Sequence, residues 1–481
     1  MSDLVLPYLS MTELAQAFRD GSLSPLEVTE RLLARIEALE RGLNAFRLVC
    51  PERALAAAKA AQTALAAGQD LGPLQGIPFA AKDLFNVRGL PTSAGSRLLE
   101  SGKAEEDSRV VNKLLQAGMV LLGKTNTVQF AYGGVGINHD HGTPVNPWSR
   151  THLVPGGSSS GSAVAVAAGE APLGLGTDTG GSVRIPSSFC GLTGLKTTVG
   201  RISRAGVYPL SQTLDSVGPL VRTVEDAALV FKALQGQDPA DETTLGIIPQ
   251  DPLSGLKEGV KGMRLAFAES VFWDGVDPEV EAAVRETGRV FQDLGARVES
   301  LDFKVAREVV ESRVQALVLS AEAYTNNQTL VEESYDRLDE IIAPRLLLGK
   351  EVTASQYLGA KAEMMRLRKE AVREMTGLEA LLVPTTILPP PPAAQVDQDP
   401  EAYIKANLAC LQNTSIGNSL GLCGLSIPCG FTAQGLPMGL MIYGRPFEEG
   451  LILRIGQAYQ AATDWHLRRP DLSWAKEEEG P

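Results

Sequence analysis

Two glycine-rich turns and one isolated lysine are the residues of this sequence best suited to chemistry. Each turn places a serine after two glycines, at Ser158 and at Ser182, and Lys82 ends an apolar run that starts near residue 76. Glycine-rich turns allow backbone N–H groups and hydroxyl groups to converge on one small volume. Acyl transfer needs this combination of a nucleophile, a base and hydrogen-bond donors for an oxyanion.

A second arrangement for nucleophilic catalysis uses Ser159 and His466. Residues 157–161 match the G-x-S-x-G pattern of the nucleophile elbow in α/β-hydrolases. That fold needs a histidine later in the chain than the serine, and His466 is the one histidine that follows. Pro155 interrupts the strand expected before the elbow. An esterase of the α/β-hydrolase type is therefore kept as a remote alternative.

No part of the sequence indicates a cofactor or a metal site. Residues 118–125 match the P-loop formula, but a strand-like apolar run occupies the positions that should wrap phosphate. His139 and His141 are too closely spaced to act as a helical pair of metal ligands, and the five cysteines are scattered. We therefore expect activity without a metal ion or a cofactor.

Charge and hydropathy argue against two classes of partner. The net charge of −13 leaves no basic surplus to neutralise phosphates, so we expect no direct binding to nucleic acid. The sequence has no run of 18 or more apolar residues, which argues against a membrane span. The first residues also lack the basic and apolar regions of a secretory signal. These features predict a cytoplasmic protein.

The elements that must position the serines and the lysine predict a mixed α/β fold. Residues 1–45 contain two capped helices, after which short apolar runs alternate with glycine- and proline-rich turns and helices. Residues 237–379 are richer in charge and more helical, and strand patterns return from residue 380. We expect one domain over residues 1–481, in which helices surround a large mixed sheet and residues 237–379 form a helical, more divergent insertion.

The residues around Lys82, Ser158 and Ser182 resemble the amidase signature family. The resemblance is carried by residues 76–83, 155–162, 176–184, 189–196, 200–201, 214–219, 425–428 and 435–439. It implies a Ser–cisSer–Lys triad, with Ser182 as nucleophile and Lys82 as ultimate base. Ser158 would bridge them, after a cis peptide bond to Gly157. A buried lysine with few carboxylates nearby can act as a base, because burial disfavours its ammonium form.

The resemblance also implies supporting roles around the nucleophile. The oxyanion hole would consist of the backbone N–H groups of Thr179, Gly180, Gly181 and Ser182. We interpret Asp178 and Arg184 as an ion pair that holds the turn rather than as catalytic groups. We expect the Asp83 side chain to point away from Lys82, since a carboxylate beside that lysine would keep it charged.

The activity implied by the resemblance is hydrolysis of a carboxamide through a serine acyl-enzyme, with release of ammonia or an amine. One branch of the family is the glutaminase component, called A, of tRNA-dependent amidotransferases, and the chain resembles it broadly. Ser160 stands where that component usually has Gly, and Ile185 where it usually has Gln. These departures favour a stand-alone amidase. The three intact triad positions disfavour a binding protein without activity.

The substrate is less well defined than the reaction. By analogy with the family, Ala131, Tyr132 and Gly133 should line the acyl pocket, with the helical insertion as its cap. The expected partner is therefore a small-molecule amide. The identity of that amide, the existence of partner subunits and a homodimer are left open by the sequence.

Overall fold

The computed structural model describes residues 6–476, whose eleven strands form one mixed sheet. Their bounds are Phe46–Val49 (β1), Pro78–Lys82 (β2), Val120–Thr125 (β3), Gly174–Asp178 (β4), Thr193–Lys196 (β5), Ser216–Val221 (β6), Arg264–Ala268 (β7), Arg297–Leu301 (β8), Ala380–Pro384 (β9), Cys423–Phe431 (β10) and Pro437–Gly444 (β11). The spatial order is β1-β3-β2-β4-β6-β5-β10-β11-β9-β7-β8. This mixed sheet confirms the predicted α/β fold class.

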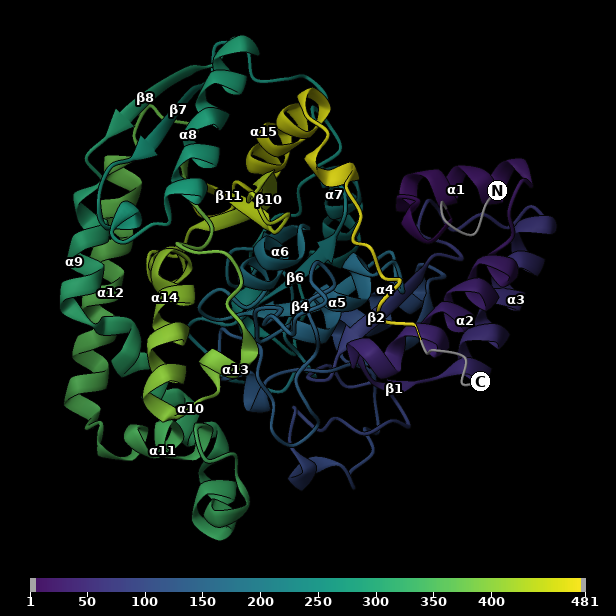
Figure 1. Cartoon of the computed structure of the whole chain (residues 1–481), viewed down its shortest axis with the longest axis horizontal. Helices are drawn as coiled ribbons and strands as arrows, with labels where there is room; N and C mark the ends of the chain where they lie inside the picture. The colour runs from purple at the N-terminus through teal and green to yellow at the C-terminus, as the bar shows by residue number, and fades with distance from the viewer. Residues whose placement is uncertain (1–5, 477–481) are drawn as a thin grey trace.

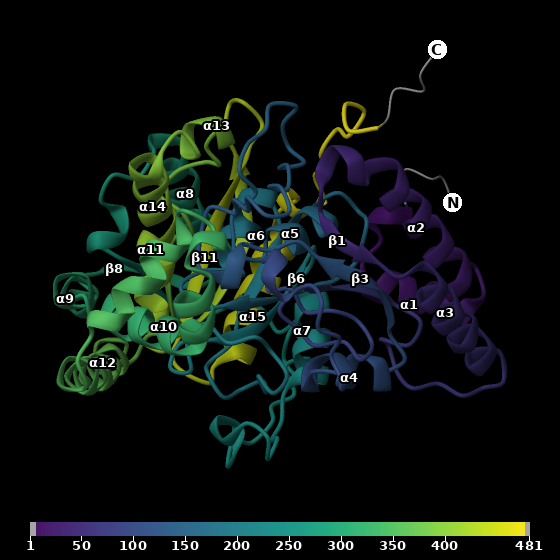
Figure 2. The ribbon, with the colours of Figure 1, turned by 90° about the horizontal axis from the view of Figure 1, so that it is seen from below.

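Helices surround the sheet, with the N-terminal helices at one end of the molecule and a long helical layer at the other (Figure 1). Their bounds are Met11–Asp20 (α1), Pro25–Leu43 (α2), Pro51–Ala66 (α3), Arg109–Gln116 (α4), Ser160–Ala167 (α5), Arg184–Cys190 (α6), Val224–Leu234 (α7), Pro278–Asp293 (α8), Lys304–Ser312 (α9), Val314–Ser334 (α10), Ile342–Leu347 (α11), Ala354–Glu374 (α12), Ala393–Val396 (α13), Pro400–Ser419 (α14) and Glu449–Ala462 (α15). Figure 2 shows α5 and α6 on one side of the central strands and α7 and α15 on the other.

The two central helices are buried on every side. All residues of α5 and α6 are buried, and α5 consists of Ser, Gly, Ala and Val alone. Small side chains let α5 pack closely against the strands β2, β4 and β6. A helix without a polar face must lie in the core. The turns that lead into α5 and α6 are therefore held inside the molecule, and these turns carry Ser158 and Ser182.

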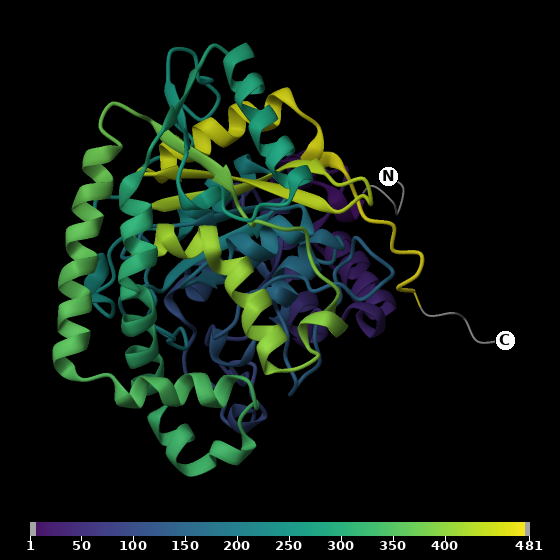
Figure 3. The same ribbon diagram turned by 60° about the vertical axis from the view of Figure 1, so that its left-hand side comes forward.

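The segment 237–379 contributes helices α8 to α12 and also two strands. The long helices α10 and α12 pack against each other along one edge of the molecule (Figure 3). Strands β7 and β8 extend the sheet beyond β9, and β7 pairs with both neighbours in parallel. The sequence pattern did not indicate these strands. In β8 no residue is fully buried, because the strand forms an edge of the sheet, so it lacks the apolar alternation of a core strand.

Membrane spans and metal clusters are both absent from the part of the chain that the structure describes. No helix within residues 6–476 is long and apolar enough to cross a bilayer. Over the same range, no group of three or more His, Cys, Asp or Glu side chains is arranged to hold a metal ion. The five cysteines carry free thiols.

Candidate active site

Sheet topology brings Lys82 to the turns that carry the two serines. Strands β2 and β4 are parallel neighbours, with Ala81 opposite Leu175. The carboxyl ends of parallel neighbours meet at the same edge of a sheet, so Lys82, the last residue of β2, lies beside the end of β4. The turn after β4 contains Ser182, and the loop before α5 contains Ser158.

Lys82 makes two hydrogen bonds with hydroxyl groups. Its Nζ donates to Ser158 Oγ at 2.7 Å and to Thr177 Oγ1 at 2.8 Å. The side chain is fully buried. Burial lowers the pKa of Lys82 from 10.5 to about 7, although the carboxylates of Asp215 and Asp178 act in the opposite direction. At neutral pH a large share of Lys82 is therefore uncharged and able to accept a proton.

Ser158 follows a cis peptide bond from Gly157, as the family resemblance implies. Its carbonyl oxygen accepts hydrogen bonds from Thr127 Oγ1 at 2.8 Å and from the backbone N–H of Val128 at 3.3 Å. The serine is completely buried. Its backbone is thus fixed from the neighbouring loop, and its hydroxyl is held against Lys82.

The turn from residue 179 to Ser182 presents a row of backbone donors. Within residues 6–476, the N–H groups of these four residues donate to no protein acceptor. Gly181 has a φ of +146°, and a Cβ there would lie 2.2 Å from Thr414 Oγ1. Thr414 Oγ1 also donates to the carbonyl of Gly180 at 2.7 Å, which fixes the turn from the side of α14. The arrangement suits the binding of an oxyanion close to Ser182 Oγ.

A buried ion pair anchors the same turn. Arg184 donates to both carboxylate oxygens of Asp178, at 3.0 and 2.9 Å, and neither side chain is exposed. Arg184 also donates to the Tyr443 hydroxyl and to Asn418 Oδ1, and the Asn418 amide donates in turn to Asp178. Burial alone would raise the pKa of Asp178, but Arg184 lowers it to about 2. Asp178 also accepts from the backbone N–H of Val183 at 3.1 Å, so the pair positions the start of α6.

The carboxylate next to the base turns away from it. Asp83 lies 2.6 Å from Lys124 Nζ, and Ser93 donates to it from the backbone at 3.1 Å. This confirms the expected orientation of Asp83. Lys124 lies in β3, so the P-loop-like residues 118–125 end in a strand and form no phosphate-binding loop.

The three expected acyl-pocket residues lie in a tight loop near the site. Ala131 has a φ of +60° and lines a cavity together with Thr177 and Thr179. The carbonyl oxygen of Tyr132 accepts a hydrogen bond from Arg345, whose guanidinium lies 4.2 Å from the centre of the Tyr132 ring. Gly133 packs so closely on Tyr403 that a Cβ would stand 2.3 Å from the phenol oxygen.

The alternative pair of Ser159 and His466 is not assembled. Ser159 Oγ donates to the carbonyl of Thr177 at 3.3 Å, and the serine is fully buried. His466 lines a different cavity together with Tyr8 and Arg222. The α/β-hydrolase alternative is therefore wrong, because its nucleophile and its base do not meet.

Three residues of the site were missed by the sequence analysis. Thr177 is the second partner of Lys82, and Thr414 reaches the oxyanion turn from α14. Asp215 accepts from Thr179 Oγ1 at 2.5 Å and from the backbone N–H groups of Leu210 and Ser211, each at 2.9 Å. Asp215 lies in one of the segments that resemble the amidase signature family, and this resemblance was the only feature of the sequence that pointed to it.

The chain also matches a known protein family over most of its length. Residues 27–453 match the family model described as Amidase. The chain belongs to the amidase signature family. It is accordingly an enzyme that acts on amide bonds, as the sequence predicted. The match covers β2, the two serine turns and β10 and β11, which together make up the site and the centre of the sheet.

The individual relatives are similar over nearly the full length. The chain is 37% identical to the A component of the glutamyl-tRNA(Gln) amidotransferase of Chloroflexus aggregans, over 98% of this chain and 99% of that protein. Among solved structures, one from work described as "An unexpected vestigial protein complex reveals the evolutionary origins of an s-triazine catabolic enzyme" is 30% identical, with a TM-score of 0.88, covering 96% of this chain and 100% of that one. A 6-aminohexanoate cyclic dimer hydrolase is 25% identical, with a TM-score of 0.89 and 97% and 99% coverage.

Proposed function

We propose that the chain hydrolyses a carboxamide through an acyl-enzyme formed on Ser182. The observation that carries this proposal is the pair of buried groups Lys82 and Ser158, whose Nζ and Oγ atoms lie 2.7 Å apart. A lysine with a pKa of about 7 in contact with a hydroxyl can accept a proton through that hydroxyl at neutral pH. Membership of the amidase signature family supports the same reaction.

The proposed reaction proceeds in two halves. Ser182 Oγ attacks the amide carbon while its proton passes to Ser158 and the proton of Ser158 passes to Lys82. The oxygen of the tetrahedral intermediate is stabilised by the backbone N–H groups of residues 179–182. The C–N bond then breaks as the leaving nitrogen takes a proton from Ser158, which Lys82 replaces. Water attacks the resulting ester by the same proton route and restores Ser182.

In this proposal Asp178 and Arg184 hold the turn and do not touch the substrate. Their ion pair links the end of β4 to the start of α6, on either side of Ser182. Ala131, Tyr132 and Gly133 are proposed as contacts of the acyl group. The reaction needs no metal ion and no cofactor.

A second candidate is the glutaminase component of an amidotransferase. The relative from Chloroflexus aggregans is named as one component of such an enzyme, at 37% identity over almost the whole chain. This similarity supports the amidotransferase alternative better than the stand-alone amidase that the sequence favoured. It also argues against a small molecule as the sole partner, because one component of an amidotransferase works with others.

The side chains that pack on the glycines of the oxyanion turn carry no charge, and this supports the proposal of an uncharged acyl group. Ile185 Cδ1 and Leu411 Cδ2 lie 2.7 Å and 3.2 Å from the positions that Cβ atoms would take at Gly181 and Gly180. The amide of Gln315, which carries no charge, lies 3.4 Å from the latter position. Glutamine carries a charged amino group and a charged carboxylate, and burying either requires a partner of opposite charge.

The two candidates separate in one assay. The purified chain is incubated with glutamine, asparagine and a set of uncharged aliphatic and aryl amides, and the release of ammonia or amine is measured. The stand-alone enzyme hydrolyses uncharged amides without any partner. Activity confined to glutamine and dependent on added partner subunits would establish the amidotransferase role instead.

A further inference from the structure

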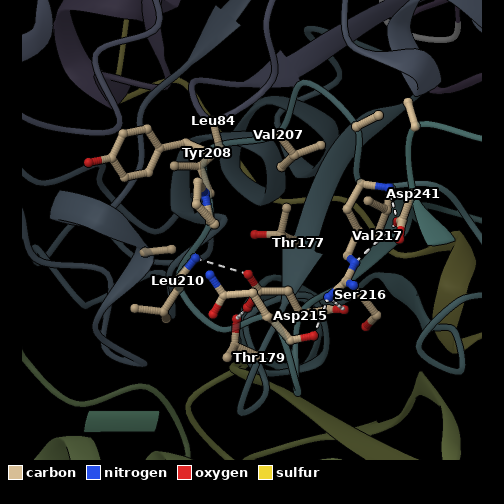
Figure 4. A pocket seen from close by; sticks show the side chains of 16 residues that line it. Leu84, Thr177, Thr179, Val207, Tyr208, Leu210, Asp215, Ser216, Val217 and Asp241 are labelled. Carbon is tan, nitrogen blue, oxygen red and sulfur yellow. Dashed lines mark hydrogen bonds and ion pairs between the residues drawn. The ribbon is translucent and has the colours of Figure 1, made fainter. Parts of the chain in front are cut away.

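Lys82 is held between two hydroxyl groups whose backbones are supported in different ways. Thr177 lies within β4, where it pairs with Val217 of β6 (Figure 4). A residue inside a paired strand is held by the hydrogen bonds of the sheet. Ser158 lies in the loop before α5 and belongs to no strand or helix. The position of its hydroxyl against Lys82 therefore depends on the contacts that hold this loop.

Residues 127–134 hold Ser158 from both sides. At the start of this segment, the Thr127 hydroxyl donates to the carbonyl oxygen of Ser158 at 2.8 Å. At its end, the carbonyl oxygen of Gly134 accepts from the backbone N–H of Gly157 at 2.7 Å. A displacement of either end of the segment therefore displaces the hydroxyl of the bridging serine.

The two ends of this segment are supported differently. Its start follows closely after β3, which ends at Thr125 and lies between β1 and β2 in the sheet. In its middle, Phe130 and Ala131 have φ values of +51° and +60°. Residues with a side chain adopt this region only where their surroundings hold them there. The far end of the segment therefore needs a contact of its own.

Asn407 of α14 supplies that contact. Its Oδ1 accepts from the backbone N–H of Gly134 at 2.7 Å, and the residue is only 4% exposed. Tyr403 and Cys410 lie about one turn away on the same buried face of α14, and both belong to an apolar cluster. A polar side chain in such surroundings costs free energy unless it is hydrogen-bonded. The bond to Gly134 offsets this cost.

We propose that Asn407 is a positioning residue, which holds the bridging serine Ser158 in place through Gly134. Two hydrogen bonds of 2.7 Å, from Gly134 N–H to Asn407 and from Gly157 N–H to Gly134, connect α14 to the serine turn. The inference rests on the proposed function and deepens it, because it names a residue outside the triad on which the proton route depends.

Ser158 has two tasks in the proposed reaction, and they separate positioning from a general loss of structure. It relays the proton of Ser182 to Lys82, and it then gives a proton to the leaving nitrogen. An amide needs both transfers, because an amine leaves only after its nitrogen is protonated. A p-nitrophenyl ester needs only the first, because p-nitrophenolate is a stable anion. A displaced Ser158 therefore slows the amide more than the ester.

The test measures kcat/KM for a primary amide and a p-nitrophenyl ester of one acyl group. Asn407→Leu keeps a similar shape but removes the acceptor. It should lower the value for the amide by about a hundredfold, the loss that a displacement of about 1 Å can cause. The ratio of amide to ester should fall by at least about tenfold, because general acid catalysis is lost for the amide alone. Asn407→Asp keeps an oxygen acceptor, ionised or protonated, and should restore the ratio of the unaltered chain.

Asn413→Leu is the matched control on the same helix. Asn413 is also buried, and its Nδ2 donates to the carbonyl oxygens of Phe272 and Pro384, each at 2.9 Å. The substitution removes buried hydrogen bonds without touching residues 127–134. It should lower the melting temperature and leave the ratio of amide to ester unchanged.

The contrary results are distinct. An unchanged ratio in folded Asn407→Leu, or equal losses for the amide and the ester, would overturn the positioning role and leave the proposed function intact. Failure of the unaltered chain to hydrolyse either substrate would overturn both. If Asn407→Leu does not fold, Asn407→Val removes the acceptor with a smaller side chain, and the same ratio decides.

Discussion

The dependence of activity on pH tests the state of Lys82. The shift of its pKa from 10.5 to about 7 corresponds to a free-energy difference of about 5 kcal/mol against the ammonium form. At pH 7 about half of the lysine is neutral, roughly 10³ times more than for a lysine of ordinary pKa. Since the neutral form is the base, activity must rise with pH through the pKa and then level off.

The expected profile follows directly from this value. With a neutral substrate that does not titrate, kcat/KM should rise about tenfold per pH unit below pH 6 and reach a plateau above about pH 8. The measurement covers pH 5 to 10 at constant ionic strength. A rise that continues in proportion to hydroxide up to pH 10 would show a lysine of ordinary pKa. A flat profile over the whole range would exclude a lysine base.

A charge-removing variant makes this test specific to the site. Asp215 stabilises the ammonium form of Lys82, so Asp215→Asn should move the midpoint of the profile to lower pH. The amide oxygen of Asn can still accept from the backbone N–H groups of Leu210 and Ser211, while its NH2 group faces Thr179 Oγ1, which can act as the acceptor. Asp241→Asn is the matched control, because the Asp241 carboxylate is paired with Arg204, and its midpoint should not move. A shift to higher pH in Asp215→Asn would refute the electrostatic reasoning.

Three further predictions concern the nucleophile, the anchor and a buried acid. Ser182→Ala should lower kcat by several orders of magnitude with an unchanged thermal melting curve, because no acyl-enzyme can form. Arg184→Met should lower the free energy of unfolding, measured in urea, by about 3–5 kcal/mol, because it leaves Asp178 buried without its partner. Burial, followed by the nearby Glu40 carboxylate, raises the pKa of Glu170 far above its usual value. The Glu170 carboxyl group therefore keeps its proton in the folded state, and the free energy of unfolding falls as the pH rises. In Glu170→Gln the free energy of unfolding should therefore fall less between pH 5 and pH 8 than in the unaltered chain.

Each of these predictions has a clear contrary result. Substantial activity in Ser182→Ala would move the nucleophile to another residue. An unfolding free energy in Arg184→Met equal to that of the unaltered chain would show that the buried pair contributes nothing to holding the turn. A stability difference between pH 5 and pH 8 that is the same with Glu170 and with Gln would show that this carboxyl is ionised in the folded protein.

The alternation of helical and strand patterns predicted the fold class, and the resemblance to the amidase signature family implied the contact between Lys82 and Ser158. Contacts that depend on distant segments were not predictable in this way. Thr414 reaches the oxyanion turn from α14, more than two hundred residues later in the chain, and its short side chain carries no motif. Thr177 was overlooked because a threonine inside a strand is common, and its role depends on the parallel pairing of β2 with β4.

The preference for a stand-alone enzyme rested on Ser160 and Ile185 alone. The structure gives Ile185 a physical role, since its side chain packs on Gly156 and next to Gly181 at the oxyanion turn. Ser160 begins α5, and its buried hydroxyl has no hydrogen-bond partner within residues 6–476. These two residues differ from those usual in the amidotransferase component, but they lie near the nucleophile and describe only the surroundings of the site. They do not decide whether the chain works with other subunits, which depends on surfaces that carry no comparable motif.

The central claim is that an acyl group is transferred to Ser182, and trapping the intermediate tests it most directly. The chain is mixed with a good uncharged amide substrate, quenched in acid within milliseconds to seconds, digested and analysed by mass spectrometry. The account predicts the mass of the acyl group on the peptide that contains Ser182, and no such adduct in Ser182→Ala. An acyl group on Ser159, or on any residue other than Ser182, would contradict it.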